Sequence, residues 1–426
     1  MFKSNYLNIF QNKRIKNFVI YGIGQSINLV SPLLVMPYLV AVCDKEGLGK
    51  IGVGFSFALI MNVWVDYGSY INGTKEIAIN RSNEEIIGRK IVSIYVMKLF
   101  LILMLLLLTI LLVYFVPFFN KERSLFFFSF LYVIGQLINP TWIFQGLENY
   151  KWISFINIIS KVLYVACVFS FITIKEDYIY ANAYLGIGLV ISSLVGLISL
   201  IKRYNLRFYK GVINDAVRLL KEEFYLTFSQ LFLSFYQYMP IMIISYVGGN
   251  NMAGQYKIID QIVMTFRTYL QMFFNFIYAD VCLQIHLSLK NGISQWAKHN
   301  GYNYILILLL VLTAFTFTEP ILLYFNISWS ELESMKFFFR LGLIIPIFMA
   351  VSTALKLLLF ALDRNHAYIN ITIGSSIFSL IVFFLLVKNT GLQGAFITNI
   401  IIEILVIILY CMVLRPIIRF RNKYEH

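Results

Sequence analysis

Residues 91–117 of the chain read IVSIYVMKLFLILMLLLLTILLVYFVP, and this stretch decides the class of the protein. Lys98 is its one charged residue. A helix rises about 1.5 Å per residue, so a helix over this stretch would be about 40 Å long and would exceed the roughly 30 Å of bilayer hydrocarbon. The stretch therefore predicts a transmembrane helix.

Similar stretches fill the rest of the chain. The 426 residues are 59% hydrophobic and 13% charged, with a mean hydropathy of +0.76, whereas a globular chain is about 45–50% apolar and about 25% charged. We predict an all-α integral membrane protein with about twelve transmembrane helices, within a range of about ten to fourteen because two pairs of spans are tightly joined. The expected spans are residues 17–42, 51–72, 91–117, 124–145, 151–174, 179–201, 223–247, 259–286, 301–325, 335–361, 366–387 and 391–414.

The formal charge of +14 indicates a partner only after the basic residues have been assigned to their loops. Membrane orientation follows Lys and Arg, which concentrate in cytoplasmic loops. With both termini in the cytoplasm, 22 of the 35 basic residues lie in inner regions, eight in outer loops and five inside spans. The charge is therefore mainly a topology signal of a multi-pass protein with cytoplasmic termini, and we expect no nucleic-acid partner.

The long hydrophilic connection near the middle of the chain divides it into two similar halves. Ile213 and Val217 lie at helical spacing opposite Arg218 and Lys221, as in a helix that rests on an anionic membrane leaflet. A solvated linker is the alternative. The predicted organisation is an N-terminal six-helix lobe (1–201), a cytoplasmic amphipathic linker helix (202–222) and a C-terminal six-helix lobe with a short basic cytoplasmic tail (223–426).

Polar side chains inside the predicted spans gather on particular faces. Ionisable groups at membrane depth cost about 2.5–3.5 kcal/mol on insertion scales, so each usually faces a cavity or a partner. At about 100° per residue, one face of the eighth span gathers Asp260, Arg267, Gln271, Asn275 and Tyr278. These faces predict a wet, polar interior.

Two other spans repeat the pattern. Asn157 and Lys161 share a face of the fifth span, and Gln237 lies beside Tyr236 in the seventh. Basic groups are prominent among the intramembrane charges, and the planar guanidinium of Arg binds phosphate well, so we predict an anionic substrate. The candidate substrate-binding residues are Arg267, Lys161, Lys98, Arg340, Lys356, Gln271, Asn275, Asn157, Tyr236 and Gln237.

Each candidate has a structural alternative. Arg267 and Lys161 could form intramembrane salt bridges that hold helices together. For the candidates Lys98, Arg340 and Lys356 the alternative is snorkelling to the interface. Carboxylates inside a membrane can bind H⁺ or Na⁺, and the candidate ion-coupling residues, for which a purely structural role is the alternative, are Asp66, Asp260 and Glu403.

The sequence offers little to a catalytic interpretation. The four His residues are isolated, and neither H-E-x-x-H nor G-x-S-x-G occurs. The four Cys residues are scattered without a C-x-x-C pair. We therefore expect a protein that is not an enzyme, with no metal and no cofactor.

Several motifs resemble one known family, the polysaccharide-export branch of the multidrug/oligosaccharidyl-lipid/polysaccharide exporter superfamily. This branch contains the Wzx-type flippases for O-antigen and capsule repeat units. The most specific match is the turn PTWIFQGLE at 140–148, which resembles the family's W-x-x-Q-G-x-E-like turn. The other matching segments are PLLVMPYL (32–39), EGLG (46–49), VDYG (65–68), TKEIA (74–78), AGQYKIID (253–260) and GLQGA (391–395) through Glu403.

The resemblance implies two six-helix lobes around a central cationic cavity, an architecture like that of MATE transporters. It also implies the transport of an undecaprenyl-diphosphate-linked oligosaccharide by alternating access across the bacterial cytoplasmic (inner) membrane, coupled to H⁺ or Na⁺, with polysaccharide polymerase or assembly proteins as partners. The alternatives are a cation-coupled exporter of drugs or small amphiphiles and a flippase for the peptidoglycan lipid precursor.

Overall fold

The computed structural model describes residues 13–424, which are almost wholly helical and include no β-strand. Ten of these helical stretches are long and apolar enough to cross a membrane. The chain is therefore a multi-pass, all-α membrane protein, as the sequence predicts.

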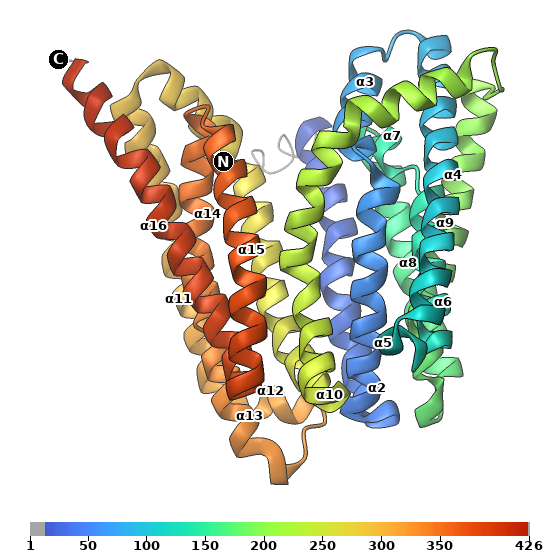
Figure 1. Ribbon diagram of the computed structural model, residues 1–426. Coiled ribbons are helices and arrows are strands. Elements are labelled where there is room, and N and C mark those ends of the chain that lie inside the picture. The colour runs from blue at the N-terminus through green and yellow to red at the C-terminus, as the bar shows by residue number, and fades with distance from the viewer. Residues whose placement is uncertain (1–12, 425–426) are drawn as a thin grey trace, which may run out of the picture. The chain divides into compact units, whose positions relative to one another are not determined.

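The chain divides into two compact units, the first ending at Ser234 and the second beginning at Phe235. The first unit holds α2 (Lys13–Asp66), the π-helix η1 (Ser69–Gly73), α3 (Thr74–Ile79), α4 (Glu84–Phe115), α5 (Pro117–Asn120), α6 (Arg123–Ile138), α7 (Thr141–Gly146), α8 (Tyr150–Phe171), the 3₁₀ helix η2 (Lys175–Tyr180), α9 (Ala181–Tyr204) and the start of α10 (Val212–Leu287). The second unit holds the rest of α10, α11 (Leu289–Thr316), α12 (Thr318–Tyr324), α13 (Trp329–Gly342), α14 (Ile345–Ala361), α15 (Asn365–Thr390) and α16 (Leu392–Tyr424). Figure 1 labels most of these helices.

Two helices are too long to be single spans. α2 has 54 residues and α10 has 76, although about 20 residues suffice to cross the hydrocarbon. Each contains one non-helical residue, Asp44 (φ 59°) in α2 and Gly249 (φ 83°) in α10, at which two helices join. Both breaks fall in turns that the sequence predicts between neighbouring spans. The count of twelve spans stays a prediction, as do the lobe boundaries at 201 and 223.

Glycines let the helices of the first unit pack closely. A Cβ added at Gly186 would lie 2.5 Å from the α6 backbone at Leu131, and one added at Gly188 would lie 2.5 Å from the carbonyl oxygen of Ser160 in α8. Small residues allow such close approach between membrane helices, where van der Waals packing replaces the hydrophobic driving force. These contacts hold α9 against both α6 and α8.

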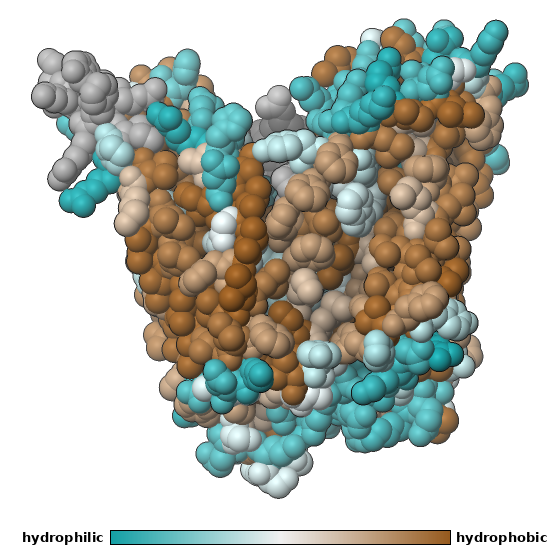
Figure 2. Space-filling model, viewed as in Figure 1, coloured by the Kyte–Doolittle hydropathy of each residue, from teal (hydrophilic) through white to brown (hydrophobic). Residues whose placement is uncertain are grey.

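Apolar side chains also cover the outside of the helices. Leu103, Leu107 and Leu111 follow one another at four-residue spacing along an exposed face of α4. Figure 2 shows hydrophobic residues over the middle of the helices and hydrophilic residues near their ends. An exposed apolar band of this kind suits contact with lipid tails.

The ion pairs of the first unit agree with the predicted division into outer and inner loops. Residues from predicted outer loops contact one another, and so do residues from predicted inner loops. The side that faces the cytoplasm stays a prediction. The ion pairs are Lys50–Glu122 (2.8 Å) and Lys175–Asp44 (2.9 Å) in the outer set and Lys90–Glu76 (3.7 Å) and Arg81–Glu148 (3.0 Å) in the inner set.

Candidate functional site

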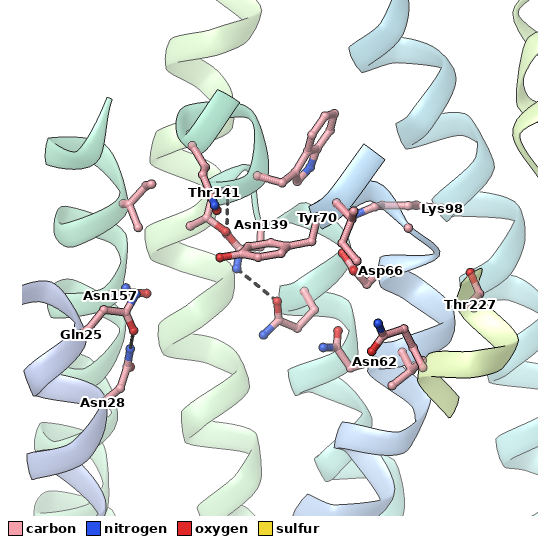
Figure 3. A pocket seen from close by; sticks show the side chains of 18 residues that line it. Gln25, Asn28, Asn62, Asp66, Tyr70, Lys98, Asn139, Thr141, Asn157 and Thr227 are labelled. Carbon is pink, nitrogen blue, oxygen red and sulfur yellow. Dashed lines mark hydrogen bonds between the residues drawn. The ribbon is translucent and has the colours of Figure 1, made fainter. Parts of the chain in front are cut away.

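The first unit contains a polar cavity of about 430 Å³. Side chains from α2, α4, α6, α7, α8 and α10 line it together with the segment around η1, as Figure 3 shows. Eight of the lining residues carry carboxamides: Gln25, Asn28, Asn62, Gln136, Asn139, Gln145, Asn157 and Gln230. A carboxamide both donates and accepts hydrogen bonds, so this wall can bind a ligand rich in hydroxyl groups.

Several of these amides are already oriented by the protein. The amide nitrogen of Asn139 donates to the Gln136 side chain at 3.1 Å, and Gln136 donates to the Tyr132 hydroxyl at 2.8 Å. On α2, Asn28 donates to the Gln25 side chain at 3.2 Å. Gln25 and Asn28 lie three residues apart on one helix face, whereas Asn139 caps the end of α6 and turns back to Gln136.

Lys98 supplies the positive charge of the cavity. Its side chain is only 2% exposed although it lies near the middle of the apolar helix α4. The ammonium group sits over the Trp142 ring, 5.7 Å from its centroid, and interacts electrostatically with Asp66. The aromatic face and the nearby carboxylate offset part of the cost of burying this charge. The Lys98 amine is thus held in the cavity wall beside an aromatic ring and near a carboxylate.

Asp66 stands where α2 ends. Gly68 adopts φ +74°, which stops the helix, and η1 follows directly. The Ser69 hydroxyl donates to the Asp66 carboxylate at 2.8 Å and orients it. The lining therefore includes one carboxylate, Asp66, and one basic side chain, Lys98, and Tyr70 adds an aromatic ring.

The second unit gathers a separate set of ionic groups. Glu403 of α16 accepts a hydrogen bond from the Ser352 hydroxyl at 2.6 Å and another from Tyr236. Arg267 of α10 interacts electrostatically with Glu403, Tyr236 and Asp260. The cluster joins residues from three helices, and its guanidinium is the group best suited to a phosphate.

Further contacts lie in and around this cluster. Lys257 lies 3.8 Å from the Asp260 carboxylate, one turn away on α10. Lys356 lies over two aromatic rings, with its ammonium 5.2 Å from the Phe274 centroid and 5.4 Å from that of Tyr368. Arg267 itself contacts the Met264 sulfur at 3.4 Å.

The predicted site residues thus fall into three sets. Lys98, Asp66 and Asn157 line the cavity of the first unit, and burial argues against snorkelling for Lys98. Arg267, Asp260, Glu403, Tyr236 and Lys356 share the cluster of the second unit. The remaining candidates make other contacts: half-buried Lys161 lies over the Tyr164 ring (5.9 Å), exposed Arg340 lies over the Phe315 ring (4.7 Å), and Gln271 is hydrogen-bonded to Asn275 (3.1 Å). Gln237 is half-buried.

Some lining residues are missing from the sequence prediction. Gln25, Asn28, Gln136 and Asn139 carry a readable signal, because pairs of amides three residues apart interrupt otherwise apolar helices. Trp142 belongs to the most specific motif, but nothing in the sequence shows that it lies over Lys98. Among the described residues, no group of three or more His, Cys, Asp or Glu side chains could hold a metal ion.

Comparison with known proteins connects the chain to polysaccharide biosynthesis. Residues 15–282 match the family described as polysaccharide biosynthesis protein. Two curated proteins, each named "Putative O-antigen transporter", are similar to the chain: one from Escherichia coli (strain K12) at 25% identity over 247 residues, and one from Shigella dysenteriae at 24% over 253 residues. The alignments cover 57% and 58% of this chain, and the chain spans only 58% and 62% of the length of those relatives.

Solved structures share the fold at low identity. An inward-facing multidrug resistance MATE family transporter of the MOP superfamily gives a TM-score of 0.73 at 14% identity, with 95% of this chain and 96% of that chain covered. The lipid II flippase MurJ in an inward closed conformation gives 0.70 at 12% identity, with 93% and 87% covered. These similarities confirm the predicted MATE-like fold class.

Proposed function

Because the chain belongs to the polysaccharide biosynthesis protein family, we propose that it is a flippase for lipid-linked oligosaccharide repeat units of the O-antigen or capsule type. It moves undecaprenyl-diphosphate-linked glycans outward across the bacterial cytoplasmic membrane by alternating access. The observation that carries this function is the buried ammonium of Lys98 in a cavity rich in carboxamides.

The chemistry of the cavity matches the two polar parts of such a substrate. The Lys98 ammonium attracts the diphosphate or an acidic sugar, because a compact cation in a poorly solvated wall interacts strongly with phosphate. The eight carboxamides exchange hydrogen bonds with sugar hydroxyls. Tyr70, which is 46% exposed, offers its ring to the apolar faces of the sugars, and the lipid tail stays in the bilayer.

The cluster of the second unit contributes a second cationic group. Arg267 binds phosphate oxygens through its planar fork, and Lys356 supports it. Asp66, Asp260 and Glu403 are the proposed H⁺ or Na⁺ sites, since each is an acidic group close to one of these cations. Binding of the coupling ion there would change the charge that the substrate meets.

Deletion of the gene followed by extraction of lipid-linked sugars tests the function. We expect one completed lipid-linked oligosaccharide to accumulate on the inner leaflet and surface polysaccharide to fall. Accumulation of the peptidoglycan precursor instead would identify a different flippase. No accumulation, together with drug sensitivity in the deletion strain, would replace the proposal with a cation-coupled exporter of small amphiphiles.

Complementation with variants tests the role of Lys98. Lys98→Met keeps the length of the side chain but removes the charge, and we expect it to restore little surface polysaccharide. Lys151→Met removes an exposed lysine at the start of α8 and is the matched control. Full complementation by Lys98→Met at normal membrane abundance would remove Lys98 from the site.

A further inference from the structure

A second cavity, of about 260 Å³, lies behind the segment that ends α2. It holds Glu223, a carboxylate that neither the sequence motifs nor the proposed function uses. Glu223 is 8% exposed. It stands on α10 ahead of the candidate membrane span Gln230–Tyr278 of that helix.

Three contacts fasten Glu223 and its helix to residues 67–73. The Asn72 amide nitrogen donates to both carboxylate oxygens, at 2.9 and 2.6 Å. The Tyr67 hydroxyl donates to the carbonyl oxygen of Leu220 at 2.8 Å, one turn earlier on α10. Gly68 packs against the carboxylate so closely that a methyl group there would collide with it. The carboxylate is thus the centre of a latch between α10 and η1.

The segment in this latch is a wall shared by the two cavities. Asp66, Tyr70 and Ile71 line the polar cavity, whereas Tyr67, Ser69 and Asn72 line the cavity of Glu223, and Gly68 lines both. The backbone of the wall is held by short local hydrogen bonds, from the amides of Ile71 and Asn72 to the Gly68 carbonyl at 3.1 and 2.8 Å. If the latch opens, the wall of the polar cavity loosens with it.

Charged groups surround Glu223 on several sides. Burial raises the pKa of the Glu223 carboxyl, while the hydrogen bond from Asn72 and the nearby Lys90 ammonium oppose that rise only in part. The Lys90 ammonium also forms an ion pair with the Glu76 carboxylate at 3.7 Å. The other charged or titratable groups that line the cavity are Lys75 of α3, Glu222 of α10 and the Tyr67 phenol.

We propose that Glu223 is a proton-binding site and that its proton controls whether residues 67–73 stay closed between the two cavities. In the closed latch the carboxyl is buried and binds a proton more readily than a carboxyl in water. When the latch opens into water, the O–H bond of the carboxyl breaks and one proton passes to solvent. A lower pH therefore favours the closed wall, because the state with the higher proton affinity is stabilised by protons.

The same linkage fixes the pH range. A solvated glutamate titrates near pH 4.3, and the buried carboxyl titrates above that value. Opening should therefore increase with pH from about 4.3 up to the pKa of the closed state and then level off. A single proton limits the slope to about tenfold per pH unit.

Hydrogen–deuterium exchange of the full-length protein in detergent tests the proposal without any glycan substrate, so its failure would leave the proposed transport function intact. The measured quantity is exchange of the backbone amides of residues 67–73 over about pH 4.5–8, corrected for the intrinsic rate at each pH. We expect corrected exchange to rise several-fold with pH in the unaltered protein. In Glu223→Gln, a neutral isostere of the protonated carboxyl, exchange should be low and independent of pH.

Two further variants separate this site from its neighbours. Glu222→Gln removes the adjacent, more exposed carboxyl and should keep the pH response. Asn72→Ala removes the hydrogen-bond donor to Glu223 and should raise amide exchange at every pH. This test does not depend on the Glu223→Gln variant. A corrected exchange that does not change with pH in the unaltered protein, or a pH response that survives in Glu223→Gln, would overturn the proposal.

Discussion

Replacement of Gly68 by alanine should destabilise the first unit by more than backbone strain alone. Gly68 has φ +74°, and a residue with a Cβ in the left-handed region costs about 1–2 kcal/mol. The new methyl group would also push the Glu223 carboxylate away from Asn72, and a hydrogen bond to a charged group contributes about 1.5–3 kcal/mol. The expected total loss is about 2.5–5 kcal/mol.

Gly211 offers a matched control in the same unit. It has φ +99°, and an added Cβ would meet no atom within 4 Å. Gly211→Ala should therefore show the strain alone, about 1–2 kcal/mol. The difference between the two variants isolates the contact with Glu223.

Thermal unfolding in detergent at one fixed scan rate measures that difference. For a unit of this size about 1 kcal/mol corresponds to roughly 2–4 °C, so the hydrogen bond, about 1.5–3 kcal/mol, should make Gly68→Ala unfold roughly 3–12 °C below Gly211→Ala. Glu223→Ala by itself removes the same hydrogen bond, so the double variant Gly68→Ala/Glu223→Ala should lose less stability than the sum of the two single variants. Equal shifts for the two glycine variants, or strict additivity in the double variant, would refute the contact.

Four other substitutions give independent checks. Lys98→Met should keep or raise thermal stability, because it removes a buried charge. It should nevertheless lower surface polysaccharide about tenfold or more if the charge binds the substrate. The unfolding midpoint and the polysaccharide are measured on the same strain. Gly188→Ala should destabilise the protein by about 1–3 kcal/mol, because its Cβ would collide with the α8 backbone. Gly301→Ala places its Cβ in open space on α11 and should stabilise the protein by about 0.5–1 kcal/mol. Both changes are measured as shifts in unfolding midpoint. Ser352→Ala removes the 2.6 Å hydrogen bond to Glu403 and should cost about 1–3 kcal/mol in the same assay.

Composition and local spacing predict the features that depend on neighbours along the chain. Apolar length places the helices, because each span must cover the hydrocarbon by itself. The motif around 140–148 and the match over residues 15–282 agree on the family. The amide pairs on α2 and α6 are readable in principle for the same reason, since residues three apart on a helix face the same side.

Contacts between distant segments are the part that the sequence could not supply. Lys98 has a snorkelling alternative on the sequence alone, and only the position of Trp142, which comes from another helix, shows that the ammonium is enclosed. Glu223 reads as the first residue after a linker, because its partner Asn72 lies 151 positions earlier. Helix periodicity assigns a face to each residue but does not say which helix that face meets.

The shared wall also joins the two proposals through thermodynamic reciprocity. Asp66, just before residues 67–73, lines the polar cavity, and Asn72 lines the cavity of Glu223. If proton binding at Glu223 favours the closed wall, any ligand that binds better when the wall is closed must raise the proton affinity of Glu223 by the same factor. A lipid-linked glycan held at Lys98 should therefore move the pH at which residues 67–73 begin to exchange. We expect that shift in the unaltered protein and a smaller one in Lys98→Met. An identical pH profile with and without the glycan, under conditions where binding is measured directly, would show that the two cavities work independently.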